Sequence, residues 1–271
     1  MFKNLNYKKW CSDNKINELF NISLNAVADV DKKIDKSLYE TVNPENKTPF
    51  PPELDDLTRL HFLARSRKAI TILEFGVGKS TLVFADALKK NKEEFGEFVK
   101  TNLRRANPFE VHCVEDVKEW INKCKQDFPP ELLDFVHFHF SEAEMTTFNA
   151  RACTMYKKLP NICPDLIYLD APGLFSVLGD VRGISTASSD RLPMSADILL
   201  LEPFLLPGTL IVVDGRTSNA RFLENNFQRN WEHNHFIAED IHTFELIEPP
   251  LGKLNERQLH FCLGDNAANF K

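Results

Sequence analysis

Short apolar runs alternate with longer amphipathic segments through most of this 271-residue chain. Five of the runs have the length and composition of buried strands, and they lie at 69–73, 111–114, 135–140, 166–169 and 209–213. Strands that are separated by helices favour a mostly parallel sheet with helices on both faces. Two later runs, at 244–247 and 258–263, predict an antiparallel pair of strands that completes an α/β fold.

Helical periodicity fills most of the remaining chain. The helices that we predict lie at about 16–24, 29–39, 53–66, 80–88, 116–126, 195–206 and 219–227. Residues 89–107 are charged and are interpreted as a helix end followed by a surface insertion. Four prolines at 44–52 predict a linker, so we divide the chain into an N-terminal helical extension with its linker, 1–51, and an α/β domain, 52–271.

Composition narrows the classes of function. The hydrophobic content is 43%, which fills a core, and the net charge of −6 gives no general attraction to nucleic acid. No apolar run reaches the length of a membrane span, and the N-terminus lacks the apolar segment of a secretory signal. The six cysteines form no C-x-x-C pair. We therefore expect a cytoplasmic protein with reduced thiols, no nucleic-acid partner and no membrane partner.

The turn after the first strand, Glu74-Phe75-Gly76-Val77-Gly78, carries the strongest signal for a ligand. Glycine permits a positive φ and lets a ligand approach the backbone where a Cβ would stand. We expect Ser80 or Thr81 to cap the following helix, whose first N–H groups would face the ligand.

Two known phosphate-binding turns do not fit this stretch. A P-loop that ends in Gly-Lys-Ser at 78–80 needs its first glycine at position 73, where the chain has Leu73. The dinucleotide fingerprint G-x-G-x-x-G needs a third glycine where the chain has Thr81.

Acidic residues recur where the later strands end, at Glu115, Glu142, Asp170 and Asp214. Because the carboxyl ends of parallel strands meet at one edge of a sheet, these side chains are expected to gather there, where α/β folds bind ligands. A carboxylate at Glu115 has the chemistry to accept hydrogen bonds from both hydroxyls of a ribose. The alternative for Glu115 is an acidic residue at a helix N-terminus, next to Asp116.

The Glu-x-Gly-x-Gly turn resembles motif I of the class I S-adenosylmethionine (SAM) methyltransferases, and the order of the later acids extends this resemblance over about 68–263. The resemblance implies a seven-stranded, mostly parallel sheet with helices on both faces and its last strands antiparallel, with SAM as the cofactor. It places the adenine near Ser141-Glu142-Ala143 and the amino acid end of SAM near the glycine turn. The cofactor-binding residues that it implies are Glu74, Phe75, Gly76, Gly78, Ser80, Thr81, Glu115, Asp116, Ser141, Glu142, Ala143 and Asp170.

The fourth strand ends in Asp170-Ala171-Pro172-Gly173. It lacks the Asn/Asp-Pro-Pro-Tyr/Phe motif of the enzymes that methylate amino groups of DNA bases or of protein glutamine. The resemblance therefore implies a small-molecule acceptor, methylated at a hydroxyl oxygen, with Asp170 as the catalytic residue. His233, His235 and His242 are further candidate bases. The loop 174–193 is expected to select the acceptor, with Arg182, Arg191 and Arg216 as candidates for holding an anionic group.

Metal-dependent O-methyltransferases of the catechol and caffeoyl-coenzyme A type offer a comparison for Asp170 and Asp214. These two residues match two of the three metal-binding positions, but Gly215 stands where the third ligand, an asparagine, is expected. We therefore assign no metal ligand, interpret Asp214 as a helix cap, and keep Mg²⁺ bound by Asp170 and Asp214 as the alternative.

Two further alternatives stay open. One is a protein of this fold that transfers an aminopropyl group from decarboxylated SAM, and the other is a non-catalytic SAM-binding protein. The N-terminal helices either close over the site or form the interface of a homo-oligomer.

Overall fold

A computed structural model gives the structure of the protein and describes residues 1–2, 5–27, 52–188, 191–192 and 194–270. A seven-stranded sheet forms its centre, in the order β3-β2-β1-β6-β7-β9-β8. The strands are β1 (Thr71–Phe75), β2 (Glu110–Glu115), β3 (Val136–Phe140), β6 (Leu166–Leu169), β7 (Leu210–Asp214), β8 (Trp231–Phe236) and β9 (Ile241–Leu246).

The pairing of the strands identifies the fold. Strands β3, β2, β1, β6 and β7 run parallel to one another, and β9 lies antiparallel between β7 and β8. A mostly parallel sheet with the last strand inserted antiparallel is the class I methyltransferase fold, so the predicted fold class is confirmed.

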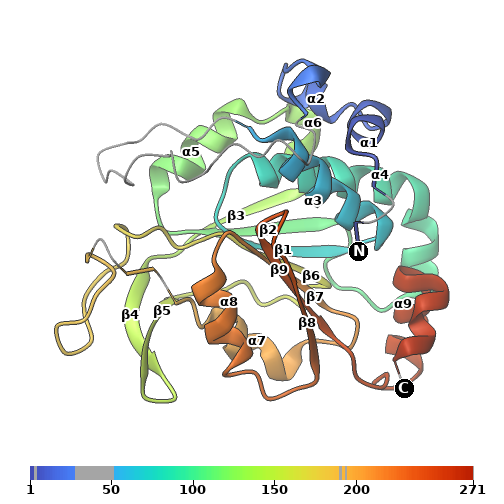
Figure 1. Cartoon of the computed structure of the whole chain (residues 1–271). Coiled ribbons are helices and arrows are strands. Elements are labelled where there is room, and N and C mark those ends of the chain that lie inside the picture. The colour runs from blue at the N-terminus through green and yellow to red at the C-terminus, as the bar shows by residue number, and fades with distance from the viewer. Residues whose placement is uncertain (3–4, 28–51, 189–190, 193, 271) are drawn as a thin grey trace.

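Helices cover both faces of this sheet (Figure 1). One face carries α3 (Leu54–Ser66), α4 (Lys79–Asn102), α5 (Lys118–Asp127) and α6 (Pro130–Leu133), and the other carries α7 (Asp197–Leu201) and α8 (Thr217–Glu224). A 3₁₀ turn, Glu202–Phe204, follows α7. The last helix, α9 (Lys253–Leu263), lies at one side of the sheet and leads into a 3₁₀ segment, Gly264–Asn269.

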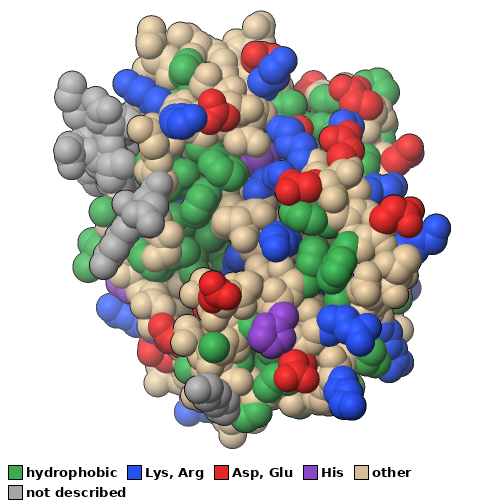
Figure 2. All heavy atoms as spheres, turned by 90° about the vertical axis from the view of Figure 1, so that its right-hand side faces the viewer, with side chains coloured by type: hydrophobic (Ala, Val, Ile, Leu, Met, Phe, Trp, Pro, Cys, Tyr) green, Lys and Arg blue, Asp and Glu red, His purple; other side chains and the backbone are tan. Residues whose placement is uncertain are grey.

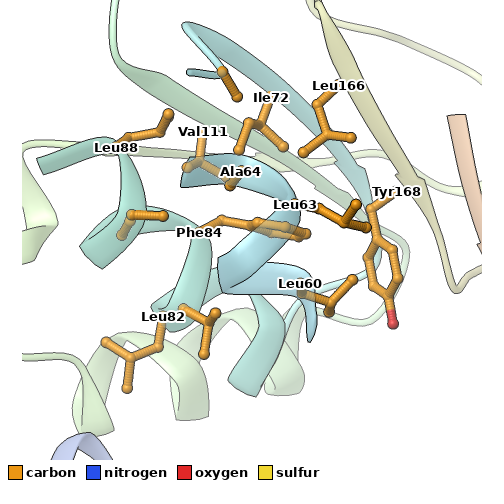
Figure 3. Close-up of a cluster of buried hydrophobic side chains, with 14 of the residues drawn as sticks. Leu60, Leu63, Ala64, Ile72, Leu82, Phe84, Leu88, Val111, Leu166 and Tyr168 are labelled. Atoms are coloured by element: carbon orange, nitrogen blue, oxygen red, sulfur yellow. The ribbon is translucent and has the colours of Figure 1, made fainter. Parts of the chain in front are cut away.

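Alternation along the strands divides the core into two layers, because successive side chains point to opposite faces. Ile72 and Val111 pack with α3 and α4 in one cluster, whereas Leu73 and Val114 pack in the other. Figure 3 shows the first cluster, in which side chains of α3, α4 and the strands meet. Full burial of one such aliphatic side chain contributes about 1.5–3 kcal/mol.

The N-terminal segment packs on the α3–α4 layer. It forms α1 (Tyr7–Asp13), α2 (Ile16–Leu19) and a 3₁₀ turn, Leu24–Ala26. Trp10 Nε1 donates to His61 Nδ1 of α3 over 3.0 Å. The predicted single helix over 16–24 is wrong, because α2 ends at Leu19 and the 3₁₀ turn begins only at Leu24. The predicted helix 29–39 and nearly all of the linker lie outside the described residues.

Two predicted segments were wrong. The expected insertion at 89–107 is mostly helix, since α4 continues to Asn102, where Val99 is buried. The expected strand at 258–263 belongs to α9, and Phe261 stacks on Phe98 at 5.1 Å between ring centroids. The apolar run of α9 is too short for its period to distinguish a helix from a strand.

A β-hairpin formed by β4 (Ala143–Phe148) and β5 (Arg151–Tyr156) was missed. Its two-residue turn consists of Asn149 and Ala150, at φ 48° and 60°. Two-residue turns with both φ values positive are usually recognised by Asn-Gly or Asp-Gly, and an alanine in that conformation gives no such signal. The hairpin extends away from the main sheet (Figure 1).

Charged side chains of both signs are interspersed on the face shown in Figure 2. On this face, the described residues therefore form no continuous basic surface of the kind that contacts a phosphate backbone. Among the described residues, no helix is both long enough and apolar enough to cross a membrane.

Candidate functional site

The carboxyl ends of β2, β1, β6 and β7 meet at one edge of the sheet, as the sequence predicts. Backbone hydrogen bonds connect neighbouring strands there: Gly76 N–H donates to Val114 O over 2.8 Å, and Asp170 N–H to Phe75 O over 3.1 Å. Ser141 N–H donates to Glu115 O over 3.0 Å and adds the end of β3. The glycine turn and the segments that end in Glu115 and Asp170 are therefore adjacent.

The two glycines of the turn have different requirements. Gly76 has φ +111°, and a Cβ there would lie 3.4 Å from the Cβ of Ala171, so the backbone itself requires glycine. Gly78 is extended, and a Cβ there would meet no atom within 4 Å. Gly78 is also the N-cap of α4, so the cap position differs from the predicted Ser80 or Thr81, although the Thr81 side chain takes part in the cap. The space above Gly78 is open to a ligand.

Three of the predicted cofactor-binding side chains point beneath the turn and hold it in place. The buried Glu74 carboxylate accepts hydrogen bonds from Ser80 Oγ and from Cys113 Sγ, the latter over 3.2 Å. Thr81 Oγ1 accepts from the Gly78 N–H over 3.0 Å. Burial raises the pKa of Glu74 to about 7. These side chains are thus engaged within the protein, where they position the turn.

Glu115 and Asp116 place two carboxyl groups at the end of β2. Glu115 is 6% exposed, and its Oε1 accepts from the Val117 N–H over 2.8 Å. Burial and, secondly, the charge of Asp116 raise the pKa of Glu115 to about 8. Asp116 Oδ2 is buried and has no hydrogen-bond partner among the described residues. An unpaired buried carboxylate oxygen is costly, and ligand hydroxyls would supply the missing donors.

Tyr156, at the end of β5, is a further component that the sequence prediction missed because the hairpin was missed. Its ring stacks on Phe75 at 5.8 Å between ring centroids. Its buried hydroxyl also lacks a hydrogen-bond partner among the described residues. Burial, followed by the charges of Asp116 and Glu115, raises the pKa of Tyr156 well above its usual range. The hydroxyl is therefore neutral and can donate or accept beside the carboxyl pair.

The predicted adenine segment follows β3. Ser141 Oγ accepts from the Lys158 N–H over 2.8 Å, and the exposed Glu142 forms an ion pair with Lys157 Nζ over 2.9 Å. Ala143 O accepts from the Leu178 N–H over 2.9 Å. All three residues thus have protein partners, and their contact with adenine stays a prediction.

Arg216 organises the end of β6. Its Nη1 donates to Pro172 O over 3.0 Å, and its Nη2 donates to Asp170 O. Its Nε lies 3.6 Å from Asp170 Oδ1, and the Asp170 side chain is 55% exposed. The guanidinium therefore anchors the backbone around Asp170 and leaves the carboxylate at the surface of the edge.

Asp214 has a different role from the predicted helix cap. Its Oδ2 accepts from the Tyr168 hydroxyl over 2.5 Å, and the N-cap of α8 is Arg216. The Arg216 guanidinium beside Asp170 would repel a magnesium ion at this position. The Tyr168 hydroxyl already donates to Asp214 and would compete with the ion for that carboxylate. The residues present do not fit the magnesium alternative, and we derive no step through a metal.

The three histidines named as alternative bases lie on β8 and β9. His233 Nε2 is 2.9 Å from His242 Nδ1, and His242 Nε2 is 3.0 Å from Thr217 Oγ1. The rings of His235 and His242 stack at 3.8 Å between centroids. Burial and the neighbouring histidines lower the pKa of His242 to about 4. These rings are engaged with one another and with Thr217, and their role as bases stays a prediction, as does that of Asp170.

A cavity of about 330 Å³ lies between the β4–β5 hairpin, the loop that precedes α7 and the start of α8. It is lined by Met145, Ala152, Cys153, Thr154, Ile184, Ser185, Thr186, Arg191, Leu192, Met194 and Ser218. The buried Thr154 Oγ1 has no hydrogen-bond partner among the described residues. Asn219 fixes one wall, because it accepts from the Ser195 N–H over 2.9 Å and donates to Ser195 O over 3.0 Å.

The sequence matches no protein-family model and no curated protein. Among solved structures, it is similar to the methyltransferase PaMTH1 of Podospora anserina with SAH bound, at 15% identity and a TM-score of 0.44, over 74% of this chain and 82% of that one. It is also similar to the O-methyltransferase TomG of Streptomyces achromogenes, involved in tomaymycin synthesis and in complex with SAM, at 13% identity and a TM-score of 0.38, over 90% of each chain. The assignment to the class I methyltransferase fold rests on the strand order of the sheet.

Proposed function

We propose that this protein is a SAM-dependent methyltransferase that acts on a hydroxyl oxygen of a small molecule. The observation that carries the proposal is the carboxyl pair at the end of β2, which lies next to the open face of the glycine turn. Asp116 Oδ2 and the Tyr156 hydroxyl, both buried and without a partner among the described residues, fit a ligand rich in hydroxyl and amino groups.

The cofactor would lie across the ends of β1, β2 and β3. Gly76 and Gly78 would let its amino acid portion approach the backbone, and Glu115 would accept from the ribose hydroxyls. Ser141, Glu142 and Ala143 stand where the adenine is expected. The sulfonium of SAM is already activated, so the protein has to align the acceptor in line and remove its proton.

The acceptor would occupy the cavity beside the hairpin. A volume of about 330 Å³ suits a small molecule, and the mostly apolar wall favours an aliphatic or aromatic body. Among the polar residues of the lining, Thr154 and Arg191 would orient it. Asp170 would accept the hydroxyl proton, and Arg216 would hold the backbone at Asp170 in position.

The affinity for SAM is expected to rise with pH between about 6 and 8. Burial raises the pKa of Glu115 to about 8, and ribose hydroxyls donate more strongly to the ionised carboxylate than to the protonated carboxyl group, so binding would lower this pKa and release a proton. The gain is at most about tenfold per pH unit. Calorimetric titration at pH 6, 7 and 8, in buffers of different ionisation enthalpy, measures both the affinity and the proton release. Glu115→Gln should flatten the profile, and an unchanged profile in that variant would assign the proton to another group, such as Glu74.

Methyl transfer itself is tested with SAM that carries an isotopic methyl label and a panel of phenols and aliphatic alcohols. We expect label in a hydroxyl-methylated product, and Asp170→Asn should reduce turnover while SAM still binds. Label on nitrogen would contradict the oxygen assignment. Preference for decarboxylated SAM, with aminopropyl products, would replace methyl transfer by the alternative chemistry, and binding without any product would leave a SAM-binding protein.

A further inference from the structure

A cluster of histidines and one glutamate lies on the first two strands of the sheet, away from the proposed cofactor edge. Glu110 Oε2 is 2.9 Å from His112 Nε2 and 3.4 Å from His137 Nε2. The three ligand atoms all lie within 4.8 Å of one another. Mutual distances of this size allow one metal ion to bind all three atoms at bond lengths of about 2.0–2.2 Å.

Strand geometry brings these side chains together. His112 and His137 are directly paired residues of the parallel strands β2 and β3, and Glu110 precedes His112 by two positions on the same face. Val111 and Val136 pack on the opposite face with α3 and α4. The ligands thus stand on two adjacent rigid strands, which is a favourable scaffold for a metal site.

Neighbouring residues orient these ligands. In the structure, His112 Nε2 donates to Glu110 Oε2, and its Nδ1 lies 3.0 Å from Nε2 of His139. An ion that displaces the Nε2 proton would leave the ring proton on Nδ1, where His139 Nε2 can accept it. Asn107 Nδ2 donates to Glu110 Oε2 over 2.8 Å. Contacts of this kind, in which the second ring nitrogen of a histidine and the carboxylate are both hydrogen-bonded, are typical of metal ligands.

Exposure leaves access for an ion. The side chain of His112 is 7% exposed, that of Glu110 is 26% exposed and that of His137 is 47% exposed. The rings of His112 and His137 stack at 4.7 Å between centroids with 23° between their planes, so a turn of the outer ring is needed for both lone pairs to converge. The His137 side chain is 47% exposed, so solvent on its outer side leaves room for this turn.

We propose that Glu110, His112 and His137 form a binding site for a divalent transition-metal ion such as Zn²⁺. Two imidazoles and one carboxylate suit zinc, whereas magnesium prefers oxygen ligands alone. The site is separate from the proposed methyl transfer, because Glu110 begins β2 and Glu115 ends it, about 16 Å away at the rise of a parallel strand. A bound ion would fasten the edge strand β3 to β2.

Equilibrium dialysis of the metal-free protein against Zn²⁺, followed by metal quantification, tests the site. We expect saturable binding of one ion at this cluster and a higher melting temperature with Zn²⁺. His137→Ala and Glu110→Gln should each weaken binding about 10–100-fold or more. The matched control is His235→Ala, which removes an exposed histidine of the second histidine cluster, on β8 and β9, and should leave this binding unchanged.

The visible absorption spectrum of Co²⁺ bound in place of Zn²⁺ shows which types of ligand hold the ion. Bound Co²⁺ should show visible d–d absorption without a thiolate charge-transfer band, because the proposed ligands contain no sulfur. No saturable binding by the wild type, equal binding by His137→Ala and Glu110→Gln, or a thiolate band would each overturn the proposal. If His137→Ala fails to fold, Glu110→Gln and the cobalt spectrum of the wild type decide.

Discussion

Gly78→Val is expected to weaken SAM binding by at least about 100-fold, or about 2.7 kcal/mol, while the protein keeps its fold. The backbone of Gly78 is extended, and a Cβ there would meet no protein atom within 4 Å, so the valine itself causes no strain. The added side chain would instead stand in the space through which the cofactor approaches the backbone. Calorimetric titration with SAM, together with a thermal melt, measures both parts of this expectation.

Two further variants of glycine complete this test. Gly96→Val, on the same helix α4, is the control and should leave SAM affinity unchanged, because its nearest neighbour is the flexible Lys92 side chain at 3.8 Å. Gly76→Val should lower the melting temperature as well, because φ is +111° there and Ala171 is 3.4 Å from the new Cβ. Wild-type affinity in a folded Gly78→Val variant would remove the argument from the glycine turn.

Glu115→Ala should weaken SAM binding by about 1–3 kcal/mol, the usual value of hydrogen bonds to a charged group. The substitution removes the acceptor for the ribose hydroxyls. It also relieves the repulsion between the buried Glu115 and Asp116, so the folded protein should lose little stability. Titration with SAM at pH 8, where the ionised carboxylate of the wild type is well populated, gives the clearest difference.

Glu119→Ala is the matched control for this variant. Glu119 lies in the first turn of α5 and is exposed, so its loss tests whether any acid near this helix N-terminus affects affinity. We expect unchanged binding for Glu119→Ala. Equal, unchanged affinities in both variants would reduce Glu115 to its hydrogen bond with the Val117 N–H at the start of α5.

The parallel core of the sheet could be predicted because its strands are short, apolar and separated by amphipathic helices. The strand at 166–169 coincides with β6, and the predicted strand at 209–213 overlaps β7, Leu210–Asp214. Such residues are buried on both faces of a parallel sheet, so their pattern is unbroken. The sequence pattern does not predict the secondary structure at the end of the chain in this way. Residues 253–263 form a helix whose Phe261 packs against Phe95 and Phe98, a tertiary contact that the local pattern does not reveal.

The sequence predicts which residues of the site lie at the edge of the sheet, because the backbone alone decides this, but it does not predict where their side chains point. Parallel strands bring Gly76, Glu115 and Asp170 to one edge whatever their side chains do. The directions of Glu74, Ser80 and Thr81 beneath the turn depend on Cys113 and on the start of α4, which no local pattern reveals. Tyr156, Arg216 and the cavity beside the hairpin come from the hairpin and from loop packing, and both are tertiary features.

Calorimetric titration of the purified protein with SAM and with S-adenosylhomocysteine tests the central claim most directly. We predict binding of both ligands at one site per chain with micromolar affinity, because both carry the ribose and adenine that Glu115 and its neighbours would hold. Failure of both ligands to bind would contradict the assignment as a SAM-dependent enzyme and leave only the fold.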